Sequence, residues 1–151
     1  MLLDAYTEFA DAVAVASAAG TNIIGDVIDL STVHDLGEGK PMWLVIQVTT
    51  AFSGGTSFQF ILASDNGAAI ATNGAETRHL LTDVFLVAEL TQGFYLGLPL
   101  PTGDVSGGIT PYERYLGVLG VGVGGSHVGS INAFLTISAP PSQRTYDDGP
   151  N

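Results

Sequence analysis

The chain has 151 residues, of which 46% are hydrophobic and 13% charged, with 15 acidic and 4 basic residues and a net charge of −11. That length fits one domain with a substantial core. So few basic residues exclude nucleic acid and anionic membrane surfaces as partners, because neither phosphates nor lipid head groups could be neutralised. Ordinary proteins carry about 25% charged residues, so the deficit favours a surface partly covered by another protein, with a surface rich in Ser, Thr, Asn and Gly as the alternative.

Alternation of apolar and polar residues predicts strands along the first half of the chain. Residues 42–52 form the clearest one, and their Leu-Val-Ile centre predicts burial on both faces. Ser53-Gly54-Gly55 then predicts a turn that joins this strand to the next in a hairpin, with Phe58, Phe60 and Leu62 on one face. Residues 10–19 fit either a helix or a strand. The strands expected in this half are 11–16, 22–30, 42–52 and 56–63.

The second half continues the pattern after an Asp65-Asn66-Gly67 turn. Pro99 is expected to end its strand or place it at a sheet edge. Gly124-Gly125-Ser126 predicts a turn that makes a hairpin of the two last strands, and 101–111 is expected to be a loop. The strands expected here are 68–72, 78–81, 84–90, 93–100, 113–123 and 127–137.

Such a series predicts an all-β fold, an antiparallel β-sandwich of jelly-roll type with eight to nine strands. We expect one domain over 1–139 and a flexible or partner-tethered tail over 140–151, where three prolines lie. The chain opens without a basic region, so we expect no signal peptide. No apolar stretch approaches ~20 residues, so no membrane span is expected. The absence of cysteine favours assembly in a reducing cytoplasm.

No motif in the sequence predicts catalysis, a cofactor or a metal. The glycines of 120–125 resemble a dinucleotide fingerprint, but a strand follows where that motif needs a helix. Ser126-His127 lacks a nucleophile elbow. The three histidines, His34, His79 and His127, have no metal-ligand spacing. The acidic residues are scattered, which is typical of a solvated surface that keeps the protein soluble.

Five segments, in their order and spacing, carry a family resemblance. They are 2–11, 28–30, 35–48, 113–116 and 133–136. Together they resemble the capsid cement proteins of tailed bacteriophages, specifically the short jelly-roll family first named from a Bordetella phage. The resemblance covers roughly residues 1–138. The chain departs from the family pattern in its late strands, where glycines at 117, 120, 122, 124 and 125 replace bulky side chains and leave the packing open.

The resemblance implies a capsid decoration protein without enzymatic activity. Such proteins bind the outer surface of the assembled head at junctions between major capsid proteins and clamp it against the pressure of the DNA. The implied partners are the phage major capsid protein and further copies of the chain, as a dimer or trimer, and the implied location is the outer surface of the virion.

Both ends of the chain are the expected contact regions, namely Met1–Asp11 and the tail after Pro140. The candidate residues are Leu2, Leu3, Tyr6, Phe9 and Tyr146. Two alternatives stay open. A carbohydrate-binding β-sandwich would present Trp43 and tyrosines such as Tyr95 on a sugar-binding face, although their place within strands favours packing. A small-barrel enzyme would need histidines and acids gathered in one cavity.

Overall fold

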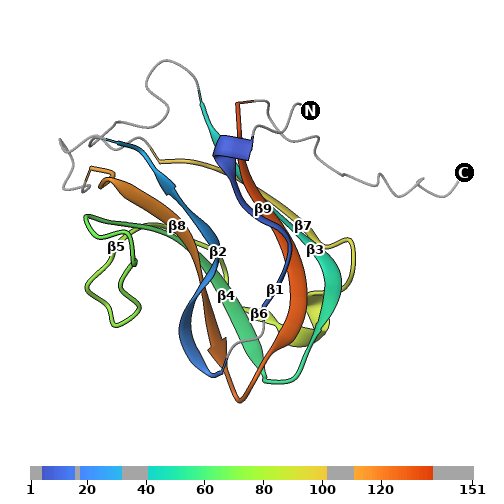
Figure 1. Ribbon diagram of the computed structural model, residues 1–151. Coiled ribbons are helices and arrows are strands. Elements are labelled where there is room, and N and C mark those ends of the chain that lie inside the picture. Colours follow the sequence, from blue (N-terminus) through green and yellow to red (C-terminus); the bar gives the residue numbers. More distant parts are fainter. Residues whose placement is uncertain (1–4, 16–17, 32–40, 102–110, 138–151) are drawn as a thin grey trace, which may run out of the picture.

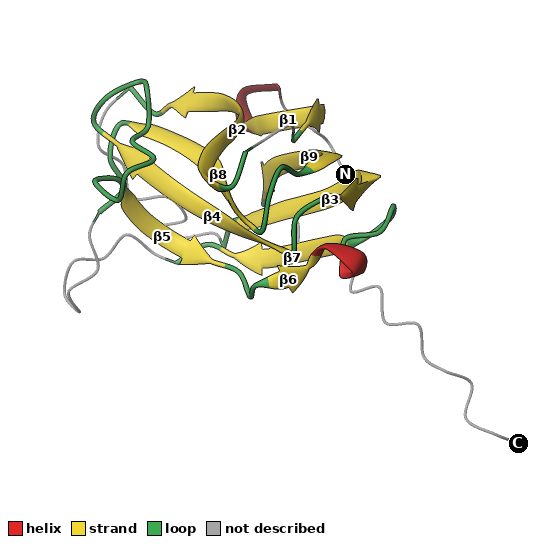
Figure 2. Cartoon of the chain, turned by 90° about the horizontal axis from the view of Figure 1, so that it is seen from below, coloured by secondary structure: helices red, strands yellow, loops and turns green. Residues whose placement is uncertain are grey.

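The computed structural model describes residues 5–15, 18–31, 41–101 and 111–137, which form two β-sheets packed face to face (Figure 1). Figure 2 shows the two layers from below. Two short 3-10 helices, η1 and η2, accompany the strands. The elements are η1 (Ala5–Thr7), β1 (Glu8–Ala14), β2 (Gly20–Asp29), β3 (Trp43–Ser53), β4 (Ser57–Asp65), β5 (Thr77–Leu81), β6 (Phe85–Leu86), η2 (Val87–Glu89), β7 (Tyr95–Pro99), β8 (Tyr115–Val123) and β9 (Val128–Thr136).

The strand order is that of a jelly roll. One sheet has the order β1-β9-β3-β7, and the other has β2-β8-β4-β5, with β6 also paired to β4. All pairs are antiparallel. β1 pairs with β9, β2 with β8, β3 with β7 and β4 with β5. The chain is therefore one long hairpin rolled into two sheets, which confirms the predicted antiparallel sandwich.

The two predicted hairpins at the glycine turns are wrong. β3 and β4 lie in different sheets, as do β8 and β9, so each turn carries the chain across the sandwich. The two turns also pack on each other. A Cβ built on Gly54, whose φ is +75°, would lie 2.3 Å from the carbonyl oxygen of Ser126, and one on Gly55 would lie 2.1 Å from the imidazole of His127. Glycine is required here by close approach and by backbone conformation.

Two other predicted strands are corrected. Residues 68–72 are an irregular loop, because the Asp65 carboxylate accepts hydrogen bonds from the amides of Gly67 and Ala71 at 3.0 and 2.9 Å and ties the loop to the end of β4. Residues 84–90 contain only the short β6 before the chain turns into η2. Between β5 and β6, Thr82 holds the chain to β4. Its amide donates to the carbonyl oxygen of Phe60, and its hydroxyl oxygen accepts from the amide of Phe60.

Other sequence predictions are confirmed. β7 ends at Pro99 and lies at the edge of its sheet. The ambiguous segment 10–19 forms strand through Ala14, with register shifts in its pairing to β9. Ala12 adopts a φ of 49°, and its amide donates to Asn132 Oδ1 at 2.6 Å. The loop predicted over 101–111 and the tail over 140–151 lie almost wholly outside the described residues.

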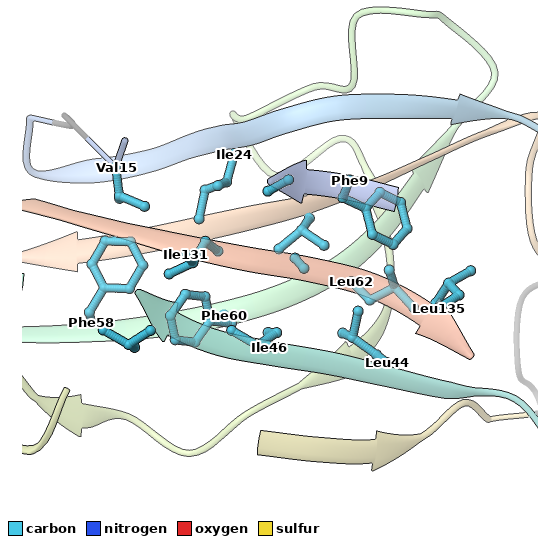
Figure 3. Close-up of a cluster of buried hydrophobic side chains, with 14 of the residues drawn as sticks. Phe9, Val15, Ile24, Leu44, Ile46, Phe58, Phe60, Leu62, Ile131 and Leu135 are labelled. Carbon is cyan, nitrogen blue, oxygen red and sulfur yellow. The ribbon is translucent and has the colours of Figure 1, made fainter. Parts of the chain in front are cut away.

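The main core fills the space between the sheets (Figure 3). Phe58, Phe60 and Leu62 of β4 all point into it, as their alternation predicted. The rings of Phe52, Phe58 and Phe60 meet edge to face, with centroids 5.1 to 6.3 Å apart. The centre of β3, Leu44-Val45-Ile46, is buried on both faces, also as predicted.

The glycines of β8 make room for this aromatic cluster. Gly120 pairs with Phe60 and Gly122 with Phe58 across the β4–β8 ladder. A Cβ on Gly120 would lie 2.3 Å from Phe58 Cζ and 2.8 Å from Ile24 Cδ1, while one on Gly122 would meet the His127 ring at 2.6 Å. The rings of Phe58 and His127 thus lie against the backbone of β8. This explains how β8, which has few bulky side chains, packs in the sandwich.

We expect Gly120→Ala to lower the free energy of unfolding by roughly 1–3 kcal/mol, because the added methyl group overpacks a site bounded by Phe58 and Ile24. Gly67→Ala is the matched control, since its Cβ would find neighbours only at 3.7 Å or beyond. Urea denaturation of both variants beside wild type checks this. Equal stability of the two variants would contradict the packing role.

Candidate interaction surface

The first candidate site is an acidic hollow beside strands β1 and β2. A depression of about 370 Å³ is lined by Tyr6, Glu8, Asp26, Val27, Ile28 and Asp29. Asp29 is engaged, since Arg114 donates to both of its oxygens at 2.9 and 2.8 Å and holds the pKa of its carboxyl at about 2. Among the described residues, no three His, Cys, Asp or Glu side chains converge to hold a metal ion.

The second candidate is a polar cluster around His79 at the end of the sandwich. The Ser64 hydroxyl lies 2.6 Å from His79 Nε2 and accepts the amide hydrogen of Glu113 at 3.0 Å. The imidazole also stacks on Tyr112, with ring centroids 4.1 Å apart. Burial lowers the pKa of His79 to about 4. Ser64 and Tyr112 are fully buried and His79 is partly buried, so this serine–histidine pair is a packed link between β4, β5 and the segment before β8.

His79 gives a testable pH dependence. Because its pKa is about 4 when folded and 6.5 in its unperturbed state, the unfolded chain takes up a proton first as the pH falls. The titration of His79 therefore leaves the free energy of unfolding unchanged above pH 6.5 and lowers it progressively between pH 6.5 and 4. We expect a loss of roughly 1–3 kcal/mol over that range in urea titrations. His79→Gln should flatten this slope, and an unchanged slope would contradict the assignment.

The remaining described histidine, His127, is a core residue. Its Nε2 lies 3.1 Å from the carbonyl oxygen of Ser57, and its ring meets Phe58 edge to face at 5.2 Å. His34 lies outside the described residues. His79 and His127 therefore belong to separate packing environments, and neither lies in a cleft with acids around it.

The structure describes two of the five predicted contact residues, Tyr6 and Phe9, and it places them in different environments. Tyr6 is 86% exposed beside the acidic hollow. Phe9, in contrast, is 1% exposed and points into the core with Leu62 and Leu135 nearby (Figure 3), so it is not available for contact with another subunit. Phe9 and its neighbour Ala10 are both in the core, at an irregularity in the pairing of β1 with β9. Leu2, Leu3 and Tyr146 lie outside the described residues.

The aromatic side chains do not form a sugar-binding face within the described part of the chain. Tyr6 is the one exposed tyrosine or tryptophan there, while Tyr112 is fully buried and Trp43, Tyr95 and Tyr115 are half-buried. Burial also raises the pKa of the Tyr95 hydroxyl. Stacking on a sugar ring needs an open ring face, so these positions serve packing.

The third candidate is the outer face of the second sheet, which is apolar. Ile24, Leu80, Phe85 and Gly122 face the core, so their strand neighbours face outward. Those neighbours are Ile23 on β2, Leu81 on β5, Leu86 on β6 and Val123 on β8, and all four are exposed. We call this set the apolar face. Exposed apolar patches of this kind mark interaction sites more often than isolated residues do.

The apolar face is ordered by the sheet register. Leu86 and Val123 both lie opposite Ser57, one on each side of β4. Leu81, Ile61, Leu119 and Ile23 form a second row of the same face. The middle of this second row is covered, because Ile70 from the loop after β4 packs on Ile61 and Leu119. The open part is therefore the end near the crossing turns.

The family of the chain follows from a comparison that spans this whole fold. A family model described as Bbp16 matches residues 9–135, from β1 into β9. The chain belongs to the Bbp16 family. No curated protein matches it. The Bbp16 name derives from a Bordetella phage, which confirms the phage family predicted from the ordered segments. No helix among the described residues is long and apolar enough to cross a membrane.

Sequence reasoning missed the apolar face of this Bbp16 chain, although a signal was present. Ile23-Ile24 and Leu80-Leu81 place apolar residues on both faces of their strands. A sheet with one solvated face shows clean alternation instead. Doubled apolar residues on strands that lie near an edge therefore indicated a second covered or contacting surface.

Proposed function

We propose that the chain is a capsid decoration protein, which binds the outer surface of the assembled phage head at junctions between major capsid proteins and stabilises it. The observation that carries this is the Bbp16 match over 127 residues (9–135), combined with the phage origin of that name. The function belongs to the surface of the sandwich and needs no catalysis.

Three features of the described residues support a binding role over an enzymatic one. The serine of the serine–histidine pair is buried, Asp29 in the acidic hollow is paired with Arg114, and no side chains converge on a metal site. A compact sandwich with a rigid aromatic core suits a clamp, because it transmits load without rearranging. Many weak copies on one particle add up to firm attachment without a deep pocket.

The direct test uses heads of the encoding phage prepared without this protein. We expect purified chain to co-sediment with these heads at a fixed copy number and to raise the temperature at which they release DNA. Heads lacking the bound protein are the reference. Failure to co-sediment at any concentration, or binding to glycans on an array in its place, would overturn the proposal.

The contribution of the N-terminus needs a narrower change than removal of residues 1–11, because Phe9 and Ala10 are core residues. We expect deletion of residues 1–4, or Tyr6→Ala, to weaken head binding while thermal stability stays close to wild type, since Tyr6 is highly exposed. Deletion of 140–151 tests the tail in the same way. Unchanged binding by all three variants would remove the termini from the interface.

A further inference from the structure

We infer that the open end of the apolar face, around Leu86 and Val123, is the surface that docks on the head, against a protein surface with an apolar centre and a basic rim. This inference rests on the proposed function. It assigns the contact to the face of one sheet, whereas the sequence predicted contacts only at the two ends of the chain.

Exposed apolar side chains gather on this face. Of the five exposed large apolar residues on the described strands, four lie on this sheet, and Val128 alone lies on the other sheet, whose strands β3, β7 and β9 also carry no charge. From Ser57 to Ala63 and from Gly117 to Val123, the outward-facing residues of β4 and β8 include no charged side chain. A protein with 15 acids on 151 residues leaves this area uncharged while Leu86 and Val123 are 56% and 54% exposed. Depletion of charge at the centre of a patch is the compositional mark of an interface.

The edge strands of both sheets are poorly suited to pair with a strand of another protein, so strand addition is not the main contact. β7 carries Pro99, which has no amide hydrogen to donate, and β1, β2 and β5 have register shifts in their ladders. At Gly25 on β2, a Cβ would lie 2.0 Å from the carbonyl oxygen of Phe9, so β1 backbone also comes close to β2 there. Prolines, bulges and cover are the devices that keep edges from pairing, which leaves a sheet face for docking.

The acidic side chains beside Leu86 indicate what kind of surface the partner presents. Asp83 and Glu89 are exposed and flank Leu86 along the chain. A second copy offers almost nothing to meet them: Arg78 and Arg114 are paired with the chain's own Glu76 and Asp29, at 2.6 and 2.8 Å. With 4 basic residues against 15 acidic ones, a second copy docked through this same face would place acidic side chains against acidic side chains. The partner surface therefore supplies lysine or arginine beside an apolar centre.

The chain provides a matched control for this inference. Val128 is a valine of similar exposure, 59%, on the other side of the same turn. The Cβ position of its neighbour Gly129 faces Phe52 in the core, so Val128 points to the outer face of the opposite sheet. Val123 and Val128 thus differ in which face they occupy and in little else.

The experiment compares Val123→Glu and Leu86→Glu with Val128→Glu in co-sedimentation with the heads described above. We expect the first two to weaken binding at least about tenfold and the control to stay within about twofold of wild type. Thermal melts establish that all three fold. Equal binding by all variants, while wild type binds, would overturn this inference and leave the decoration function standing. Absence of wild-type binding would overturn the function itself.

A footprint gives a second readout without a charge change. The chain has no cysteine, so Val123→Cys and Val128→Cys each create a single thiol. We expect maleimide labelling at position 123 to be suppressed by added heads and labelling at 128 to continue. Protection of position 123 in the free protein, together with a dimer or trimer in sedimentation velocity that Val123→Glu dissociates, would show that a second copy covers the face and would overturn the assigned partner.

Discussion

The close contact between the aromatic rings of β4 and the bare backbone of β8 sets the geometry of the sandwich. Phe58 occupies space that a side chain on Gly120 would fill, and His127 does the same at Gly122. Because both glycines lie opposite phenylalanines in the ladder, the rings can pack edge to face in the centre of the core. The crossing turns depend on the same contacts, since His127 also lies against Gly55. A side chain added at Gly120 or Gly122 would overlap these rings and strain the packing between the sheets.

The sequence predicted the class of fold and most strands because alternation is a local property. It did not reveal strand partners: a Gly-Gly turn between two strands looks the same whether the strands pair or cross to opposite sheets. The partner is fixed by register with strands far away in the chain, such as β3 with β9. Phe9 shows the same limit at a single residue, since alternation says that faces differ but does not say which one is inside. The loop at 68–72 was not predicted because it depends on a single carboxylate, Asp65, which accepts hydrogen bonds from the amides of Gly67 and Ala71.

The surface divides into two chemical regions that suit a protein which is made free and then attaches. Acidic side chains lie around β1, β2 and the turns and contribute to the net charge of −11. The outer face of the second sheet carries no charged side chain from Ser57 to Ala63 and from Gly117 to Val123, and it is partly shielded by Ile70. The glycine string and the described histidines, which were the candidate chemical groups in the sequence, instead have roles in packing. Gly55 and Gly122 provide space that His127 fills, while His79 packs on Tyr112 and Ser64.

The pairing of the first strand with the last has a practical consequence for engineering. Glu8 at the start of β1 lies opposite Phe134 near the end of β9, so both termini join the sandwich at one end. The crossing turns, with Val123 and Leu86 beside them, lie at the other end (Figure 1). The described ends of β1 and β9 therefore lie about the length of a nine-residue strand, roughly 30 Å, from Val123 and Leu86. A probe attached beside Glu8 would report on one end of the sandwich without covering the open end of the apolar face.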